Sequence, residues 1–352
     1  MKFVLPWILE SLLLFSGASF SCAQETPSVN QPTTLADLLA EAERNNPQIQ
    51  VAWHEWQSAG HIPSQVSTLP DPQFVLQHVS VGSPRPFAGY TNSDFAYIGL
   101  GVSQDLPYPG KLRLRGEIAK KEADVMQQRY ESVRRAILAQ VKMVYFQLAY
   151  LAKRQTILDG DGQVLQQVEQ AAQARYRSGM GHQQEVLQAQ LERTKLLREV
   201  SANQLESGQV QAAIKQSLGR PQSSPDVVPI EIAETVAGST YDQMLSAAMA
   251  HNPEISRAQK MVERQKLQVD LAKKDFYPDF NLQYMWQRTD PAQFRAYYQF
   301  TLGVRIPIYR GRRQRPELAQ AEADQDRAKS EHEMQSQHIG FQLRQQFLAA
   351  EK

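Results

Sequence analysis

The chain has 352 residues, of which 21% are charged, and its formal net charge at pH 7 is +1. A charge this close to zero argues against nucleic acid as a partner, because nucleic-acid-binding domains carry a basic patch. The single cysteine, Cys22, excludes an internal disulfide and a zinc site built from cysteines. The seven histidines are scattered without a convincing metal-binding spacing, so we expect no metal and no cofactor.

The first 23 residues have the features of a secretory signal peptide. Lys2 supplies the positive start, residues 12–15 are the centre of a short apolar run, and small residues precede a cleavage point after Ala23. Cys22 could instead accept a lipid anchor, but Ser19-Phe20-Ser21 is a poor lipoprotein signal, so we favour ordinary cleavage. In either case the chain is exported, and residues 24–33 read as a flexible tether.

A first structural repeat is predicted at residues 34–220. It begins with two short helices, the first capped by Thr33 or Thr34 and the second starting at Asn46-Pro47. The sequence LPDP at residues 69–72 stops the second helix, because neither proline can continue it. Two strands follow, and their predicted ranges are 73–81 and 95–106.

The stretch at residues 110–218 predicts a long helical hairpin. Apolar residues recur in steps of three or four along its first arm, at Tyr130, Val133, Ile137, Val141, Val144, Leu148 and Leu151. Residues 159–162, with the sequence DGDG, are the one soft point of that arm, where a solvated kink is expected. The glycine-containing residues 177–181 form the tip. At about 1.5 Å per residue the first arm would reach roughly 100 Å.

After a linker at residues 221–238, the same order of elements recurs in residues 239–352. Asn252-Pro253 parallels Asn46-Pro47, and corresponding positions lie roughly 200 residues apart, so a whole unit is duplicated. The second repeat is predicted to contain strands at 279–288 and 294–308 and a long helix from residue 316. No second glycine tip or returning arm follows, and we therefore expect that the chain is truncated within that helix.

The four strands alternate apolar and polar residues. Such a strand suits a membrane β-barrel, with lipid on one side and a wet lumen on the other, although a half-buried strand of a soluble sandwich alternates identically. Four strands are too few to close a barrel, so several copies of the chain would have to share one sheet. The candidate lipid-facing residues are Ile98, Leu100, Val102, Phe280, Leu282, Tyr284, Trp286, Phe300, Leu302 and Val304.

From residue 35 to its end, the chain resembles the TolC family of outer-membrane efflux proteins. The resemblance rests on both Asn-Pro helix starts, on LPDP and YPDF before the strands, and on DLPYPGK and RIPIYRGR after them. The most specific match is the tip sequence ARYRSGMGHQQEVLQAQ. The LPDP and PYPGK variants look similar to a branch associated with metal efflux, which is a weaker signal. The missing second hairpin arm departs from the family pattern.

This resemblance implies a mainly α-helical protein with a membrane β-barrel portion, in which three copies share a twelve-stranded barrel and a coiled-coil tunnel. It implies a homotrimer in the cell outer membrane, with a large periplasmic portion that meets a periplasmic adaptor and an inner-membrane pump. Conduction would be passive, of a drug, metal or protein cargo. The tip residues that would contact the adaptor or gate the tip are Arg175, Tyr176, Arg177, Gly179, Gly181, Glu185, Val186, Leu187 and Ala189.

Other functions remain open at this point. An enzyme is disfavoured because the sequence contains no nucleophile elbow, phosphate loop or zinc motif. A periplasmic coiled-coil scaffold or adaptor would share the long hairpin, but an adaptor should also carry a domain of short strands and glycine-rich turns. A non-functional remnant of an efflux channel is the third alternative, because a truncated chain would lack one arm.

Overall fold

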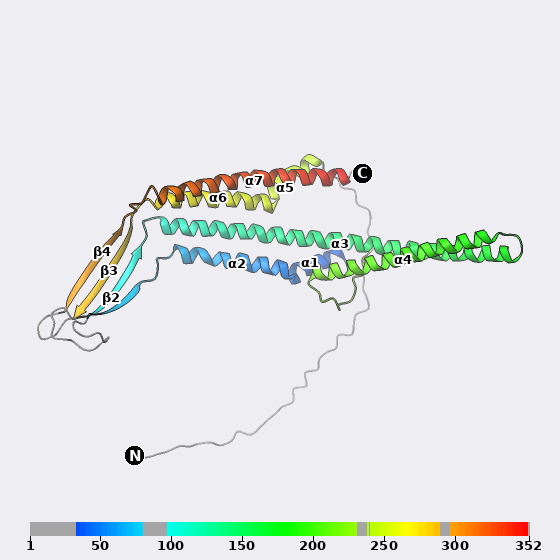
Figure 1. Ribbon diagram of the computed structural model, residues 1–352, viewed down its shortest axis with the longest axis horizontal. Coiled ribbons are helices and arrows are strands. Elements are labelled where there is room, and N and C mark those ends of the chain that lie inside the picture. Colours follow the sequence, from blue (N-terminus) through cyan, green and yellow to red (C-terminus); the bar gives the residue numbers. More distant parts are fainter. Residues whose placement is uncertain (1–32, 80–96, 231–237, 239, 289–295, 351–352) are drawn as a thin grey trace, which may run out of the picture.

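The computed structural model describes residues 33–79, 97–230, 238, 240–288 and 296–350. The predicted signal peptide with Cys22 and the rest of the tether before Thr33 lie outside the described residues. The described chain is elongated, with the strands at one end and the tip of the helical hairpin at the other (Figure 1). Mainly helical structure with four strands per chain was predicted, and this fold class is confirmed.

The elements occur in two successive series. The first series is α1 (Leu35–Asn45), α2 (Pro47–Ser67), β1 (Gln73–Val79), β2 (Tyr97–Leu106), α3 (Lys111–Arg177) and α4 (Gln183–Leu218). The second series is α5 (Tyr241–His251), α6 (Pro253–Lys274), β3 (Asp279–Arg288), β4 (Tyr297–Arg305) and α7 (Gln314–Ala350). Helix α7 therefore begins two residues before the predicted position, and the described part of β4 ends before the predicted residues 306–308.

The short helices begin as their sequences predict. The Thr34 side chain accepts a hydrogen bond from the Asp37 amide, which caps α1. Asn46 and Asn252 cap α2 and α6 in the same way, each followed by a proline in the first helical turn. Thr240 and its helix form a reciprocal capping box at the start of α5. Local sequence thus determines where these helices start.

The four strands form one antiparallel sheet in the order β1-β2-β3-β4. Strands β2 and β3 join the two repeats, with Leu100 opposite Trp286. Strands β1 and β4 lie at the two edges, and neither pairs with a further strand among the described residues. Parts of the predicted strands at residues 80–81, 95–96 and 294–295 lie outside the described residues.

Helix α3 has 67 residues and packs against α2, α4 and α6. Residues 159–162 were predicted as a soft point with a kink, but the helix is continuous through them. The side-chain amide of Gln155 donates to the Asp159 carboxylate 2.9 Å away, a contact that reinforces the helix locally. Gly162 faces α4, since a Cβ atom there would lie 3.6 Å from the Leu196 side chain, whereas Gly160 has nothing within 4 Å. Helix α3 packs along α4, and such tertiary contacts outweigh weak intrinsic propensity.

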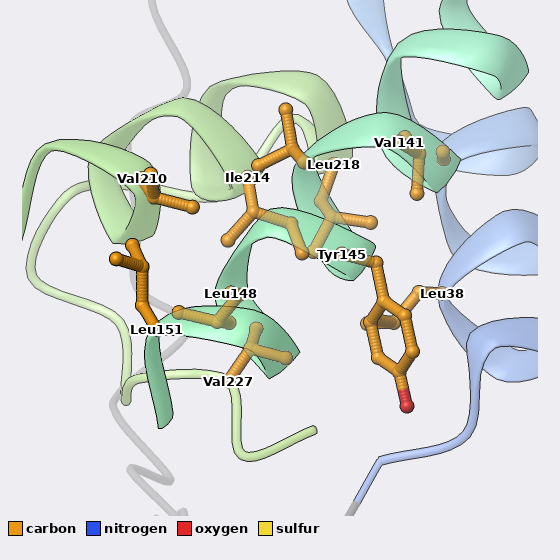
Figure 2. Packing of buried hydrophobic residues seen from close by; sticks show 11 residues of the cluster. Leu38, Val141, Tyr145, Leu148, Leu151, Val210, Ile214, Leu218 and Val227 are labelled. Atoms are coloured by element: carbon orange, nitrogen blue, oxygen red, sulfur yellow. The ribbon is translucent and has the colours of Figure 1, made fainter. Parts of the chain in front are cut away.

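The main apolar core lies in the middle of the molecule, where α1 packs against α3 and α4 (Figure 2). Its members include Leu38, Val141, Tyr145, Leu148, Leu151, Val210, Ile214, Leu218 and Val227. The Tyr145 hydroxyl donates to the Thr33 carbonyl and accepts from the Ile230 amide, both at 3.1 Å. Val227 belongs to the predicted linker and Thr33 to the predicted tether, so parts of both segments are fixed to the core.

A polar seam holds the second repeat against the first. Lys121 of α3 lies 2.6 Å from the Glu263 carboxylate of α6, and Arg264 of α6 pairs with Glu122 of α3. The Arg135 guanidinium donates to the carbonyl of His251 at 2.9 Å. Charged pairs of this kind fix the relative orientation of two helices but contribute little to the free energy of unfolding. They set how α6 lies along α3.

Candidate functional site

One face of the sheet is apolar across all four strands. The register places Leu76 opposite Leu100, Leu100 opposite Trp286, and Leu282 opposite Leu302. Because residues directly opposite each other in a sheet point to the same side, all the candidate lipid-facing residues share this face. It remains largely uncovered: Phe74 is 83% exposed, Phe300 is 65% exposed and Leu302 is 56% exposed. A continuous apolar sheet surface of this kind marks an interaction site.

The opposite face of the sheet carries polar side chains and glycines. Asn281 donates to the Ser103 hydroxyl at 3.1 Å and to the Asp105 carboxylate at 2.9 Å. Gly99 and Gly101 leave the space that Met285 occupies, since a Cβ atom at either position would lie 3.3 Å from that side chain. The face therefore contains hydrogen-bonded polar groups, in contrast to the apolar face.

A compact junction connects the sheet to the helices. The ammonium group of Lys111, whose side chain is 4% exposed, lies 2.9 Å from the Asp279 carboxylate and 3.0 Å from that of Asp275. The Asp279 carboxylate also accepts the Tyr108 amide at 2.8 Å. Tyr108 stacks on Tyr277 with ring centroids 4.6 Å apart. Sequence reasoning missed this junction, although the charges of Lys111 and Asp279 in the PGK and YPDF motifs were visible signals.

The hairpin tip is a tight turn closed by backbone hydrogen bonds. The Gly179 amide donates to the Tyr176 carbonyl at 3.1 Å, and the Met180 amide donates to the Arg175 carbonyl at 2.9 Å. Gly179 has a φ of 75°, which side chains rarely adopt, and this pattern is the common glycine ending of a helix. Gly181 is confined as well, because a Cβ atom there would lie 3.1 Å from the Arg175 side chain.

The predicted tip residues divide into an exposed and a packed group. Arg175, Tyr176 and Arg177 are exposed on the α3 side, and Leu187 is 57% exposed on the α4 side. Ala189 is buried between the arms, while Glu185 and Val186 are half-buried. Arg177 donates to the side-chain carbonyl of Gln173 at 3.4 Å, and in the described part of the chain neither arginine forms an ion pair with Glu185.

Two buried polar residues below the tip hold the arms in register. Glu169 of α3 is 8% exposed, and its carboxylate accepts hydrogen bonds from Arg193 at 2.9 Å and Gln190 at 3.3 Å, both from α4. Farther along, the Asn203 amide of α4 donates to the Leu151 carbonyl at 3.3 Å and to the Gln155 side chain. A polar group buried at a helix seam penalises slipped alignments, so these contacts position the tip. Sequence reasoning did not single them out.

None of the helices in the described ranges combines the length and the apolar character needed to cross a lipid bilayer. Comparison with curated proteins finds no match.

The fold is shared with solved outer-membrane channels. VceC from Vibrio cholerae is 19% identical, with a TM-score of 0.70, over 86% of this chain and 75% of that one. The Campylobacter jejuni CmeC outer membrane channel is 14% identical, with a TM-score of 0.69, over 94% of this chain and 76% of that one. The open state of the Neisseria gonorrhoeae MtrE outer membrane channel is 16% identical, with a TM-score of 0.68, over 86% of this chain and 70% of that one.

The family described as "Outer membrane efflux protein" has a model that matches residues 38–220 and 244–351. The two matched segments correspond to the two series of elements, and together they cover most of the chain. This match confirms the resemblance that the strand-flanking and tip motifs indicated. The chain belongs to the outer membrane efflux protein family.

Proposed function

We propose that this protein is the outer-membrane subunit of a tripartite efflux or type I secretion system. In this role three copies form a barrel in the outer membrane and a helical tunnel in the periplasm, and cargo passes through passively. The tunnel receives cargo from an inner-membrane pump through a periplasmic adaptor. The protein itself is a conduit and carries out no chemical step.

One observation carries this proposal. A single chain presents an apolar sheet face at one end and an exposed glycine turn at the other, joined by α3, a helix of 67 residues. At about 1.5 Å per residue this helix is roughly 100 Å long, which suits the distance from a membrane to a partner deep in the periplasm. A soluble scaffold has no need for the uncovered apolar face.

The two edges of the sheet support the proposed trimer. With β1 and β4 unpaired in the described chain, closure requires strands from further copies, because a lipid-exposed sheet edge would leave backbone groups without partners. Residues exposed at the tip, Arg175, Tyr176 and Leu187, are the proposed adaptor contacts. Cys22 remains only a candidate lipid anchor.

The first test separates a membrane duct from a periplasmic scaffold. Envelope fractions of a Gram-negative host that expresses the full chain are washed with sodium carbonate. We expect the protein to stay with the outer membrane, because the apolar strand face is held by lipid. Release into the wash would favour the scaffold alternative and contradict the proposal.

The second test locates the adaptor contact. A photo-cross-linking residue replaces Tyr176 at the tip, and the matched control replaces Tyr150, which is also an exposed tyrosine of α3 but lies far from the tip. With the candidate adaptor from the same host co-expressed, we expect cross-links from position 176 only. Equal cross-linking from both positions would contradict a contact at the tip.

A further inference from the structure

The connection between β4 and α7 carries a dense group of positive charges where the sheet meets the helices (Figure 1). Between Tyr297 and Pro316 the sequence contains five arginines and no acidic residue. Arg305 lies opposite Asp279 in the sheet, so an acidic neighbour compensates its charge. The other four arginines are all exposed and form the arginine patch: Arg310, Arg312, Arg313 and Arg315.

Contacts within the described chain neutralise little of the charge of this patch. Arg313 pairs with Glu317 at 3.2 Å, and the Arg310 guanidinium donates to a backbone carbonyl at 3.2 Å. Arg310, Arg312 and Arg315 form no ion pair among the described residues. Positive charge is also disfavoured beside the N-terminus of a helix, and α7 begins within the patch. Helix stability therefore does not account for the four arginines.

The corresponding connection of the first repeat, between β2 and α3, is built differently. Gly110 and Leu112 occupy the positions that Arg310 and Arg312 occupy in the second repeat. The lysine of the first connection, Lys111, is buried and paired with two aspartates. A connection of this shape therefore forms with its cation consumed inside the chain. The exposed arginines of the second connection are additional to that need, and their charge is available to a partner outside the described chain.

The apolar face of the sheet leads directly into the patch. Val304 lies on that face, and the residues that follow remain uncovered: Ile306 is 59% exposed, Ile308 is 73% exposed and Tyr309 is 69% exposed. The patch begins at the next residue, Arg310. Apolar side chains, then a tyrosine, then arginines is the order in which a protein surface passes from hydrocarbon to the headgroups of a bilayer. The patch is therefore positioned to meet lipid headgroups.

We propose that the arginine patch binds the headgroups of anionic phospholipids at the periplasmic surface of the outer membrane. This inference rests on the proposed function, in which the apolar sheet face lies in lipid. A lipid phosphate accepts the paired N–H donors of a guanidinium, a bidentate contact for which arginine is better suited than lysine. Each basic residue at a membrane surface raises the affinity for anionic lipid by about fivefold. Bound lipid holds the junction of sheet and helices at a fixed depth.

The test measures lipid contact at the patch itself. The full chain with Cys22→Ser and Tyr309→Cys carries a fluorophore at position 309 and is reconstituted into phosphatidylcholine vesicles. Phosphatidylglycerol or phosphatidylcholine, each spin-labelled at the same acyl carbon, is added in increasing amounts, and quenching of the fluorophore is recorded. The ratio of the two amounts that give half-maximal quenching measures the preference for the anionic headgroup.

We expect phosphatidylglycerol to quench at an amount at least about fivefold lower than phosphatidylcholine. Arg312→Gln combined with Arg315→Gln should reduce this preference at least about threefold, because two unpaired charges are lost. The matched control, Lys142→Gln with Arg198→Gln, removes two exposed charges on the helices and should leave the preference unchanged. Salt at about 1 M should reduce the preference of the chain that retains its arginines, because it screens exposed charges.

Equal quenching by the two lipids would overturn the proposal, and so would a preference that survives both the double variant and the salt. Sedimentation velocity in detergent adds a second reading. If the double variant alone loses its oligomeric state and the parent shows no lipid preference, the patch contacts a second copy of the chain instead.

Flotation of the vesicles after a carbonate wash separates failure of this proposal from failure of the proposed function. A chain that floats with the vesicles but shows no lipid preference would overturn the lipid contact and leave the proposed function standing. A chain that is washed off the vesicles would overturn both.

Discussion

Gly219 should be among the positions least tolerant of a methyl group. It ends α4 with a φ of 73°, and a Cβ atom there would lie 2.6 Å from the carbonyl oxygen of Asn45 and 3.3 Å from the ring of Pro47. The end of α4 packs this closely because the Asn46 side chain donates to the Ser217 carbonyl at 2.8 Å. The helix end and the junction of α1 with α2 are thereby fixed together.

The structure supplies a matched control for Gly219→Ala. Gly179 has nearly the same φ, 75°, and also follows a helix, but a Cβ atom there would meet nothing within 4 Å. The left-handed backbone costs alanine about 1 to 2 kcal/mol at both positions. At Gly219 the clash with backbone adds about 1 to 3 kcal/mol, because the chain must shift to accommodate the methyl group. We expect Gly219→Ala to lower the free energy of unfolding by about 2 to 5 kcal/mol.

Urea unfolding followed by helical circular dichroism would measure both variants in the same detergent. The expected signature is a difference between them of about 2 kcal/mol, with Gly179→Ala the milder change. Equal destabilisation would show that backbone conformation alone accounts for the effect, and the close approach of α4 to Asn45 would be refuted.

Three further predictions concern side-chain contacts. Replacing Glu169 by Ala removes the buried carboxylate that Arg193 contacts, and we expect faster proteolysis near the tip and a loss of about 1 to 3 kcal/mol; unchanged proteolysis would contradict the register role. Tyr145→Phe should cost about 1 to 3 kcal/mol in urea unfolding, because the Thr33 carbonyl and Ile230 amide lose their partner; an unchanged midpoint would contradict this. The hydrogen bond from Lys121 holds the pKa of Glu263 below its ordinary value of 4.5, so its stabilising contribution is present above that pH and is lost as the pH falls through the lower folded pKa. The same contact raises the pKa of Lys121, whose contribution is present below 10.5 and is lost above its raised pKa. Glu263→Gln should therefore flatten the acid limb of stability against pH, and an unaltered acid limb would contradict the ion pair.

Local signals in the sequence determined much of this fold. Asn46 and Asn252 before prolines set the starts of α2 and α6, because a cap acts through backbone groups within one turn. Alternation along β2 determined that Leu100 lies on the same side as Val102, since side chains in a strand alternate sides, whereas the pairing through β3 placed Leu302 on that face as well. The tip sequence gave the position of the turn, because Gly179 takes a backbone conformation that few residues adopt.

Only the tertiary structure decided which distant residues meet. Glu169 and Asn203 look like ordinary polar residues of solvated helices until α4 lies against α3 and buries them. Lys111 forms its ion pair only when β2 pairs with β3, which brings the Asp279 carboxylate within 2.9 Å of its ammonium group. The DGDG segment has weak helix propensity, and the packing of α3 as a whole against α4 overrides that preference. Contacts between residues far apart in sequence depend on how whole elements pack, which no local pattern encodes.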